Sequence, residues 1–154
     1  MLKPGDKVPD LRGQTADGAV RLRDLKGKFV AVYFYPKDST PGCTRQAQDF
    51  RDLQKIFAKK GAIVIGVSRD SLKSHENFRE KQGLAFALVA DTDETWCRAF
   101  DVIHEKVLYG KRYLGIVRST FLIGPDGRLR REWRGVKVPG HAAAVLEALD
   151  AESA

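Results

Sequence analysis

The sequence has few of the features that mark several large classes of protein. It contains only 2 cysteines in 154 residues, too few for a framework of disulfide bonds. No apolar run approaches the length of a membrane-spanning helix. Segment 1–6 lacks the apolar core of a signal peptide. We therefore expect a cytoplasmic protein with no membrane partner, in a compartment where thiols stay reduced.

The composition is otherwise that of a globular protein with an excess of positive charge. Hydrophobic residues make up 43% of the chain and aromatic residues 9%. We expect residues 1–154 to form a single domain, because no linker, repeat or low-complexity segment interrupts them. The formal net charge of +7 raises nucleic acid as a partner. The basic residues are scattered, however, so we interpret the charge as a solvated surface and expect no nucleic-acid partner.

The apolar pattern predicts strands and helices in alternation. Apolar runs at 29–35 and 62–67 predict two buried strands, and the helical period between them predicts a helix. Strands joined in this way are parallel neighbours. Later elements are expected at these positions: helix 72–82, strand 86–89, strand 116–123, strand 128–133 and a helix from about Gly140. The order predicts an α/β fold, a central mixed β-sheet flanked by helices on both faces.

Local signals add further expectations. Asp17-Gly18 is a hairpin turn signal. Asp91 followed by Glu94 resembles a capping box, which predicts the start of a helix there. Residues 101–115 show no clear period, and we interpret them as a basic loop. The turn signal at 124–127 predicts that the last two strands are antiparallel.

Cys43 stands at the junction between the strand 29–35 and the helix that follows. Thr40-Pro41 predicts the start of that helix, with a hydroxyl cap and then proline at the first helical position. Cys43 then falls in the first turn, where free backbone N–H groups and the helix dipole stabilise an anion. A thiol placed there tends to ionise, and the thiolate is the reactive form. The local sequence thus predicts an activated cysteine.

A nucleophilic Cys43 needs groups that stabilise a thiolate and a leaving oxygen anion. Thr40 could donate its hydroxyl into the same pocket, and Pro36 could shield one side from water. Arg118 is the candidate cation, because an arginine stays charged and offers several donors. It stands in the largely apolar segment 116–123, where a charge needs a partner. The pattern alone equally permits Arg118 to lie on a solvated face of that strand.

Segment 35–44 carries a motif that extends this prediction. Its sequence, Tyr-Pro-Lys-Asp-Ser-Thr-Pro-Gly-Cys-Thr, resembles the peroxidatic-cysteine signature of peroxiredoxins, Pro-x-x-x-Thr-x-x-Cys. The Tyr-Pro-Lys-Asp and Thr-Pro-Gly-Cys-Thr pieces point to the Q-type, or bacterioferritin-comigratory, branch of the family. Segments 2–10, 66–75 and 118–123 resemble further parts of that branch in the same order. The resemblance therefore covers nearly the whole chain.

The resemblance implies a thioredoxin-like fold and thiol-dependent reduction of hydrogen peroxide and organic hydroperoxides. Cys43 would be the peroxidatic cysteine, which the peroxide oxidises to a sulfenic acid. Thr40 and Arg118 would polarise the bound peroxide and stabilise the charge on its oxygens. The implied reaction requires no metal, flavin or haem. The implied reductant is thioredoxin or another thiol, and the implied state is a monomer.

The sequence departs from this branch at the second, resolving cysteine. Gln48 and Arg79 stand at the two positions where members of the branch carry it, and Gln46 stands where many have glutamate. Cys97 is the other thiol, and we interpret it as a packing residue. The alternative is that Cys97 resolves the sulfenic acid after local unfolding, because a disulfide needs Cα atoms roughly 4.4–6.8 Å apart. If it does not, an external thiol recycles Cys43 directly.

Other functions fit parts of the sequence less well. A thiol–disulfide reductase of the same fold would need Cys-x-x-Cys, and residues 43–46 lack the second cysteine. A nucleic-acid-binding module would need basic and aromatic residues interleaved on one face, and no such motif occurs. A basic redox-sensing or chaperone-like binding protein stays open beside the peroxidase. The histidines have no metal-ligand spacing and are interpreted as surface or capping residues: His75, His104 and His141.

Overall fold

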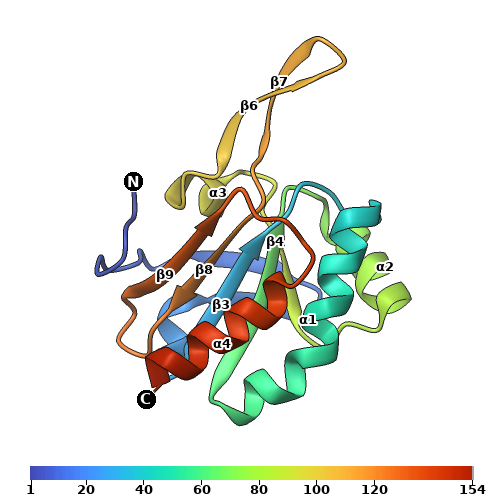
Figure 1. The fold of residues 1–154 in the computed structure, drawn as a ribbon. Coiled ribbons are helices and arrows are strands. Elements are labelled where there is room, and N and C mark those ends of the chain that lie inside the picture. Colours follow the sequence, from blue (N-terminus) through green and yellow to red (C-terminus); the bar gives the residue numbers. More distant parts are fainter. Residues whose placement is uncertain (154) are drawn as a thin grey trace.

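Five strands form the central sheet of the computed structural model, which describes residues 1–153 (Figure 1). They lie in the order β5-β4-β3-β8-β9. Their bounds are Phe29–Phe34 (β3), Ala62–Ser68 (β4), Ala87–Ala90 (β5), Ser119–Ile123 (β8) and Leu129–Arg134 (β9). β3, β4 and β5 are parallel, whereas β8 is antiparallel to both β3 and β9. The predicted mixed sheet is therefore confirmed.

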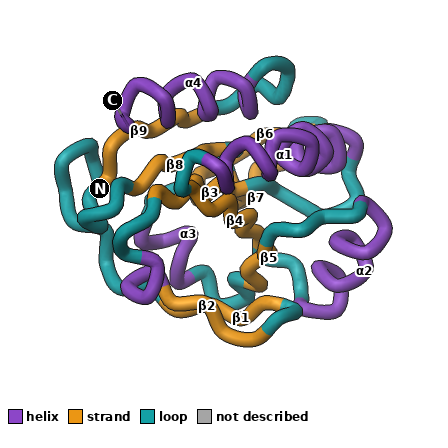
Figure 2. The backbone as a smooth tube through the Cα atoms, turned by 90° about the horizontal axis from the view of Figure 1, so that it is seen from below, coloured by secondary structure: helices purple, strands orange, loops and turns teal. Residues whose placement is uncertain are grey.

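Helices cover both faces of this sheet (Figure 2). α1 (Pro41–Lys59) and α4 (His141–Ser153) lie on one face, and α3 (Thr95–Ala99) lies on the other. Successive side chains of a strand point to opposite faces, and β3 divides accordingly. Tyr33 belongs to the apolar cluster beneath α1 and α4, and Phe34 belongs to the cluster beneath α3. The predicted arrangement of helices on both faces is confirmed.

α2 (Leu72–Gln82) packs beside the edge strand β5. Its N-cap Ser71 accepts a hydrogen bond from the backbone N–H of Ser74 at 3.1 Å. It ends at Gly83, whose φ of 63° lies in the left-handed region that glycine adopts most readily. These bounds agree with the predicted helix 72–82. Among residues 1–153, no helix is both long and apolar enough to cross a membrane.

The N-terminal segment forms a small hairpin of its own. β1 (Arg12–Thr15) and β2 (Gly18–Arg21) are antiparallel, with Ala16-Asp17 as the two-residue loop. The predicted hairpin is confirmed, with its loop one residue earlier than the turn signal suggests. A short 3-10 helix, η1 (Leu22–Leu25), leads from this hairpin toward β3.

A second hairpin occupies most of the segment that was predicted as a basic loop. β6 (Ile103–Leu108) and β7 (Lys111–Ile116) pair with each other and project from the rest of the molecule (Figure 1). The prediction of a loop for 101–115 was wrong because most side chains of this hairpin are exposed, so no apolar period marks the strands. Tyr109 and Gly110 form its turn with φ of 51° and 75°, as a type I′ turn requires.

Several strand boundaries and one helix start also differ from the predictions. β5 begins one residue later than expected, and β8 begins at Ser119 because residues up to Ile116 belong to the projecting hairpin. α3 begins at Thr95 rather than at Asp91. The Asp91 carboxylate still holds the helix start, because it accepts hydrogen bonds from the backbone N–H groups of Trp96 at 3.0 Å and Cys97 at 2.8 Å.

Candidate active site

Cys43 lies in the first turn of α1, close to the carboxyl end of β3. Thr40 is the N-cap of this helix and Pro41 its first residue, as predicted. The predicted hydroxyl cap was wrong, because the Thr40 side chain accepts no hydrogen bond from the helix start and donates to the Lys37 carbonyl instead. The Cys43 side chain is only 2% exposed, so little water competes for its sulfur. The thiol thus lies at the positive end of a 19-residue helix, where an anion is stabilised.

Arg118 supplies a cation to the same turn of α1. Its Nη2 donates a hydrogen bond to Cys43 Sγ at 3.4 Å, and its Nη1 donates to Gln46 Oε1 at 2.6 Å. A guanidinium beside a thiol favours the thiolate over the neutral form. The structure therefore brings the two predicted residues together, although they are 75 positions apart in the chain.

Arg118 does not lie within a strand, and the prediction of a continuous strand 116–123 was wrong in this respect. The residue lies in the connection between the projecting hairpin and the central sheet. Its carbonyl accepts a hydrogen bond from the backbone N–H of Val136 at 2.9 Å. This connection fixes the backbone of Arg118 beside the start of α1. The alternative of a solvated strand face does not apply, because Arg118 lies between two strands.

Gly42 makes room for this guanidinium. A Cβ atom at this position would lie 3.2 Å from Arg118 Nη2, tighter than most real Cβ contacts. Gln46 is 1% exposed, and its Nε2 finds no hydrogen-bond partner within residues 1–153. The role of Gly42 was missed in the sequence because a need for close approach leaves no local pattern.

Thr40 and Pro36 flank the segment between β3 and α1. The Thr40 hydroxyl donates to the carbonyl of Lys37 at 2.8 Å, so it stabilises this segment and is not hydrogen-bonded to Cys43. Pro36 is half-buried and follows the fully buried Tyr35. Both side chains lie at the predicted place in the chain. Their roles toward a peroxide stay predictions.

Cys97 lies in the apolar cluster on the other face of the sheet from Cys43. Its side chain is fully buried, and it forms no disulfide. Burial raises the pKa of the Cys97 thiol, and the hydrogen bond and negative charge of Asp91 raise that pKa further. Such a thiol is a poor nucleophile at neutral pH. The burial and the raised pKa of this thiol fit the interpretation of Cys97 as a packing residue.

The histidines differ from their interpretation as surface or capping residues. His104 is exposed, but His75 and His141 are 1% and 7% exposed, so the interpretation was wrong for these two. An imidazole ring is tolerated in a core when its nitrogens are hydrogen-bonded. Both buried rings meet this condition, through Asp38 and Thr120 respectively.

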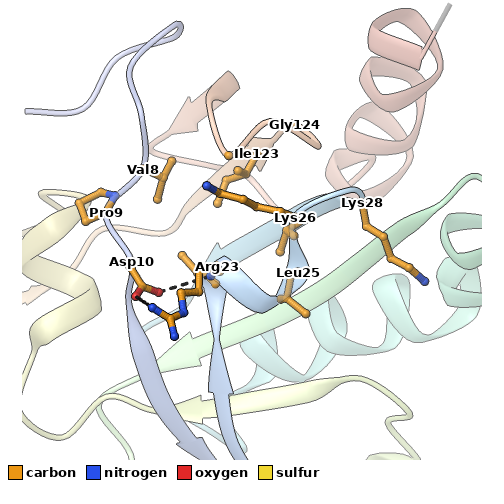
Figure 3. A pocket seen from close by; sticks show the side chains of 12 residues that line it. Val8, Pro9, Asp10, Arg23, Leu25, Lys26, Lys28, Ile123 and Gly124 are labelled. Atoms are coloured by element: carbon orange, nitrogen blue, oxygen red, sulfur yellow. Dashed lines mark hydrogen bonds and ion pairs between the residues drawn. The ribbon is translucent and has the colours of Figure 1, made fainter.

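A separate cavity of about 90 Å³ lies at the opposite end of β3 from Cys43 (Figure 3). Apolar side chains including Val8, Leu25 and Ile123 line it, and Lys26 lies across it. Because it is lined by Val30 at the start of β3, whereas Cys43 follows the carboxyl end of that strand, it forms no part of the candidate active site.

Comparison with known proteins agrees with this geometry. Residues 4–132 match the AhpC/TSA family. Peroxiredoxin Bcp of Xanthomonas campestris is 60% identical over 132 residues, 86% of this chain and 82% of that protein. Peroxiredoxin Bcp of Bacillus subtilis is 51% identical over 149 residues, 96% of this chain and 95% of that protein.

The fold comparison gives the same result. A solved structure of the Xanthomonas campestris bacterioferritin comigratory protein, whose alkyl peroxide reduction activity has been studied, has a TM-score of 0.92 to this chain. It is 53% identical, with coverage of 100% of this chain and 99% of that one. The predicted thioredoxin-like fold and hydroperoxide-reducing activity are confirmed. The chain belongs to the AhpC/TSA family, as a peroxiredoxin of the Bcp branch.

Proposed function

We propose that Cys43 is the peroxidatic cysteine of this peroxiredoxin. The observation that carries the proposal is the 3.4 Å contact between Arg118 Nη2 and a thiol in the first turn of α1. The Cys43 thiolate attacks one oxygen of the hydroperoxide, a sulfur–oxygen bond forms and the oxygen–oxygen bond breaks. The leaving oxygen takes the electron pair of that bond and a proton, and departs as water or an alcohol. Cys43 is left as a sulfenic acid.

Arg118 and Thr40 act on the peroxide oxygens in this proposal. The guanidinium stabilises negative charge on both the attacking sulfur and the leaving oxygen, because its Nη2 already donates to the sulfur. The Thr40 hydroxyl lies at the same helix end and donates to the peroxide when it leaves its bond to the Lys37 carbonyl. Half-buried Pro36 limits the access of water to this pocket. The substrates are alkyl hydroperoxides and hydrogen peroxide, by analogy with the studied relative.

We further propose that an external thiol, thioredoxin or another, reduces the Cys43 sulfenic acid directly. The relative Xanthomonas campestris peroxiredoxin Q has at least two cysteines, since its structures include two different cysteine-to-serine mutants. In this chain Gln48 and Arg79 occupy the positions expected for a resolving cysteine. Cys97 lies across the central sheet, so a bond to Cys43 needs local unfolding. The enzyme then works as a cytoplasmic monomer without metal or cofactor.

Intact mass under non-reducing conditions tests both parts of the proposal. Wild type, Cys43→Ser and Cys97→Ser each receive one equivalent of peroxide, as hydrogen peroxide and as an alkyl hydroperoxide. We expect a gain of about 16 Da in wild type and in Cys97→Ser, and none in Cys43→Ser. A loss of about 2 Da in wild type that Cys97→Ser abolishes would show a Cys43–Cys97 disulfide instead. Peroxide turnover by Cys43→Ser would refute the assignment of the peroxidatic residue.

A further inference from the structure

The hairpin of β6 and β7 projects into solvent and exposes apolar side chains (Figure 1). Its large apolar side chains that are exposed are Val107, Leu108, Tyr109, Tyr113 and Leu114, and Tyr109 at the turn is 96% exposed. A soluble protein rarely leaves a group of apolar side chains in water unless they contact another molecule. The peroxide chemistry proposed above uses none of them. The hairpin is therefore a candidate contact surface.

The hairpin emerges beside the start of α1. Phe34 at the end of β3 pairs with Ser119 at the start of β8, so α1 and the hairpin leave the sheet at the same end. Only Val117 separates Arg118 from the last residue of β7. Arg118 Nη2 lies 3.4 Å from Cys43 Sγ. The base of the hairpin thus adjoins the residue that contacts the reactive thiol.

The base of the hairpin is fixed to the body of the protein. Ile116 is fully buried in the apolar cluster beneath α3, and Ile103, which pairs with it across the hairpin, packs against that cluster. Arg69 Nη2 donates a hydrogen bond to the Leu114 carbonyl at 3.3 Å. Each strand has 6 residues, so the tip lies about 20 Å beyond this base. The hairpin therefore stands in a defined position beside the active site.

One face of the hairpin combines apolar and basic side chains. Residues directly opposite each other in an antiparallel pair lie on the same face. Lys106 pairs with Tyr113, and two residues further on Leu108 pairs with Lys111, so these four share a face, here called the docking face. A Cβ atom at Gly115 would lie 2.9 Å from Tyr113 Cε2 and 3.2 Å from Lys106 Cδ. The Tyr113 ring and the Lys106 stem therefore extend over Gly115 toward the base.

The charges of the hairpin favour an acidic partner. Arg112 forms an ion pair with Glu105 at 3.2 Å, whereas within residues 1–153 Lys106 and Lys111 belong to no ion pair. The docking face therefore presents positive charge, on a chain whose formal net charge is +7. A second copy of this chain would bring the same positive charge to the contact, and like charges across an interface are unfavourable. The complementary surface carries carboxylates beside apolar groups.

The length of the hairpin favours a protein over a membrane as this partner. An apolar turn flanked by cations can enter an anionic bilayer. If this tip did so, the hairpin would hold Cys43 about 20 Å from the lipid. A folded protein of about 100 residues has a radius of gyration of about 13 Å. Such a protein can cover the docking face and still bring one of its thiols to Cys43.

We propose that the docking face binds the protein that reduces the Cys43 sulfenic acid, a dithiol protein with apolar and acidic groups around its reactive cysteine. This role rests on the proposed function, in which an external thiol recycles Cys43. A thiolate of the partner attacks the sulfenic sulfur, a sulfur–sulfur bond forms, the sulfur–oxygen bond breaks, and the oxygen takes a proton and leaves as water. The partner's second thiolate then attacks the partner's own sulfur in the mixed disulfide. This step releases the Cys43 thiolate and leaves the partner oxidised to a disulfide.

The test compares a protein dithiol with a small dithiol. Steady-state reduction of hydrogen peroxide is followed with thioredoxin, kept reduced by its reductase, and separately with dithiothreitol. The readout is the ratio of kcat/KM for thioredoxin to kcat/KM for dithiothreitol, because a small dithiol needs no docking face. For Tyr113→Ser, which removes apolar contact, and for Lys111→Glu, which reverses a charge, we expect this ratio to fall about tenfold.

Ile56→Ser and Lys55→Glu are the matched controls. Both positions are exposed and lie near the end of α1 that is far from Cys43, so we expect the wild-type ratio in each. A wild-type ratio in the two hairpin variants would overturn the docking role, and so would the failure of thioredoxin to support turnover of wild type. Thermal melts accompany the kinetics. If Tyr113→Ser does not fold, the exposed Lys111→Glu decides.

Two further measurements cover the other occupants of the hairpin. Sedimentation with phosphatidylserine vesicles detects binding to a lipid surface, and analytical ultracentrifugation detects a dimer. Vesicle binding or a dimer that Tyr113→Ser or Lys111→Glu abolishes, with the wild-type kinetic ratio, would assign the hairpin to a membrane or to a second copy. Either result would overturn the docking role.

Failure of this role is distinguishable from failure of the proposed function. If Cys43 is not the peroxidatic residue, Cys43→Ser retains turnover with either reductant. If Cys97 resolves the sulfenic acid, wild type loses about 2 Da after peroxide. If only the docking role fails, both of those results are absent and the hairpin variants keep the wild-type ratio.

Discussion

Arg118 Nη2 lies 3.4 Å from Cys43 Sγ, and the Nη1 of the same guanidinium lies 2.6 Å from Gln46 Oε1. Cys43 and Gln46 are three residues apart on α1, so they lie on the same face of the helix. The amide oxygen thus orients the guanidinium that faces the sulfur. Two features therefore set the position of this cation relative to the thiol: the Gln46 side chain on α1, and the backbone connection between β7 and β8 that carries Arg118.

Replacing Arg118 tests the contribution of the guanidinium. For Arg118→Ala we expect kcat/KM for a hydroperoxide to fall by about 10² to 10³, the usual cost of removing one donor to a developing oxyanion. Arg118→Lys should lie between wild type and Arg118→Ala, because lysine keeps the charge and loses the planar fork. Stopped-flow peroxide consumption measures both. Arg112→Lys, at an arginine whose side chain is 77% exposed, is the control. An Arg118→Ala enzyme within twofold of wild type would contradict this role.

Gln46→Glu tests the orientation of the guanidinium. The Gln46 Nε2 is buried without a partner inside the described chain, and glutamate would remove this unpaired donor and form a charge-assisted bond to Arg118. We expect the free energy of unfolding to rise by about 1 kcal/mol. Alkylation of Cys43 should slow at neutral pH, because the new carboxylate offsets the charge of Arg118.

Urea unfolding and iodoacetamide alkylation measure these two effects of Gln46→Glu. Gln48→Glu is the control, since Gln48 donates to Gln82 at 3.0 Å, whereas Arg118 donates to Gln46 and Cys43. Faster alkylation in Gln46→Glu would show that the amide limits the reactivity of the thiol. That result would run against the role given to Gln46 above.

Cys97→Ala tests the interpretation of Cys97 as a packing residue. The sulfur is fully buried in the cluster beneath α3, so we expect the free energy of unfolding to fall by about 1 kcal/mol. Turnover with an external thiol should stay within twofold of wild type. Urea unfolding and a coupled peroxide assay measure the two quantities. Loss of turnover with retained stability would assign a chemical role to Cys97.

His141 makes the stability dependent on pH. Burial lowers the pKa of His141 to about 4, and the positive charge of Arg118 contributes in the same direction. An unfolded histidine titrates near 6.5, so between about pH 6.5 and 4 the unfolded state binds a proton that the native state does not. His141 should therefore contribute its full stabilisation above about pH 6.5, and the free energy of unfolding should decrease by about 3 kcal/mol as the pH falls to 4.

His141→Gln should remove this pH dependence. Its side chain can still form a hydrogen bond with Thr120, which His141 Nε2 contacts at 2.7 Å, but it does not titrate. Urea unfolding at pH 7 and pH 4.5 gives the comparison, with the exposed His104→Gln as control. If His141→Gln and wild type lose the same stability over this range, another group is responsible.

Several features followed from local sequence alone. The start of α1 at Pro41, the bounds of α2 and the β3–α1–β4 order depend on caps, breakers and apolar runs within contiguous residues. The hairpin at 103–116 was missed because its strands are largely exposed, so burial leaves no period in the sequence. The capping-box pattern placed the helix start at Asp91, whereas α3 begins at Thr95 and the Asp91 carboxylate binds its first turn from four residues earlier.

The sequence by itself determined that Cys43 occupies a helix start after a buried strand, because capping and strand formation are properties of neighbouring residues. Only the tertiary structure decided that Arg118 reaches this thiol, that His75 is buried beside Asp38 and that Cys97 faces the opposite side of the sheet. These outcomes depend on which distant strands pair and on which face each side chain lies. Register and strand pairing are long-range choices, and no local pattern encodes them.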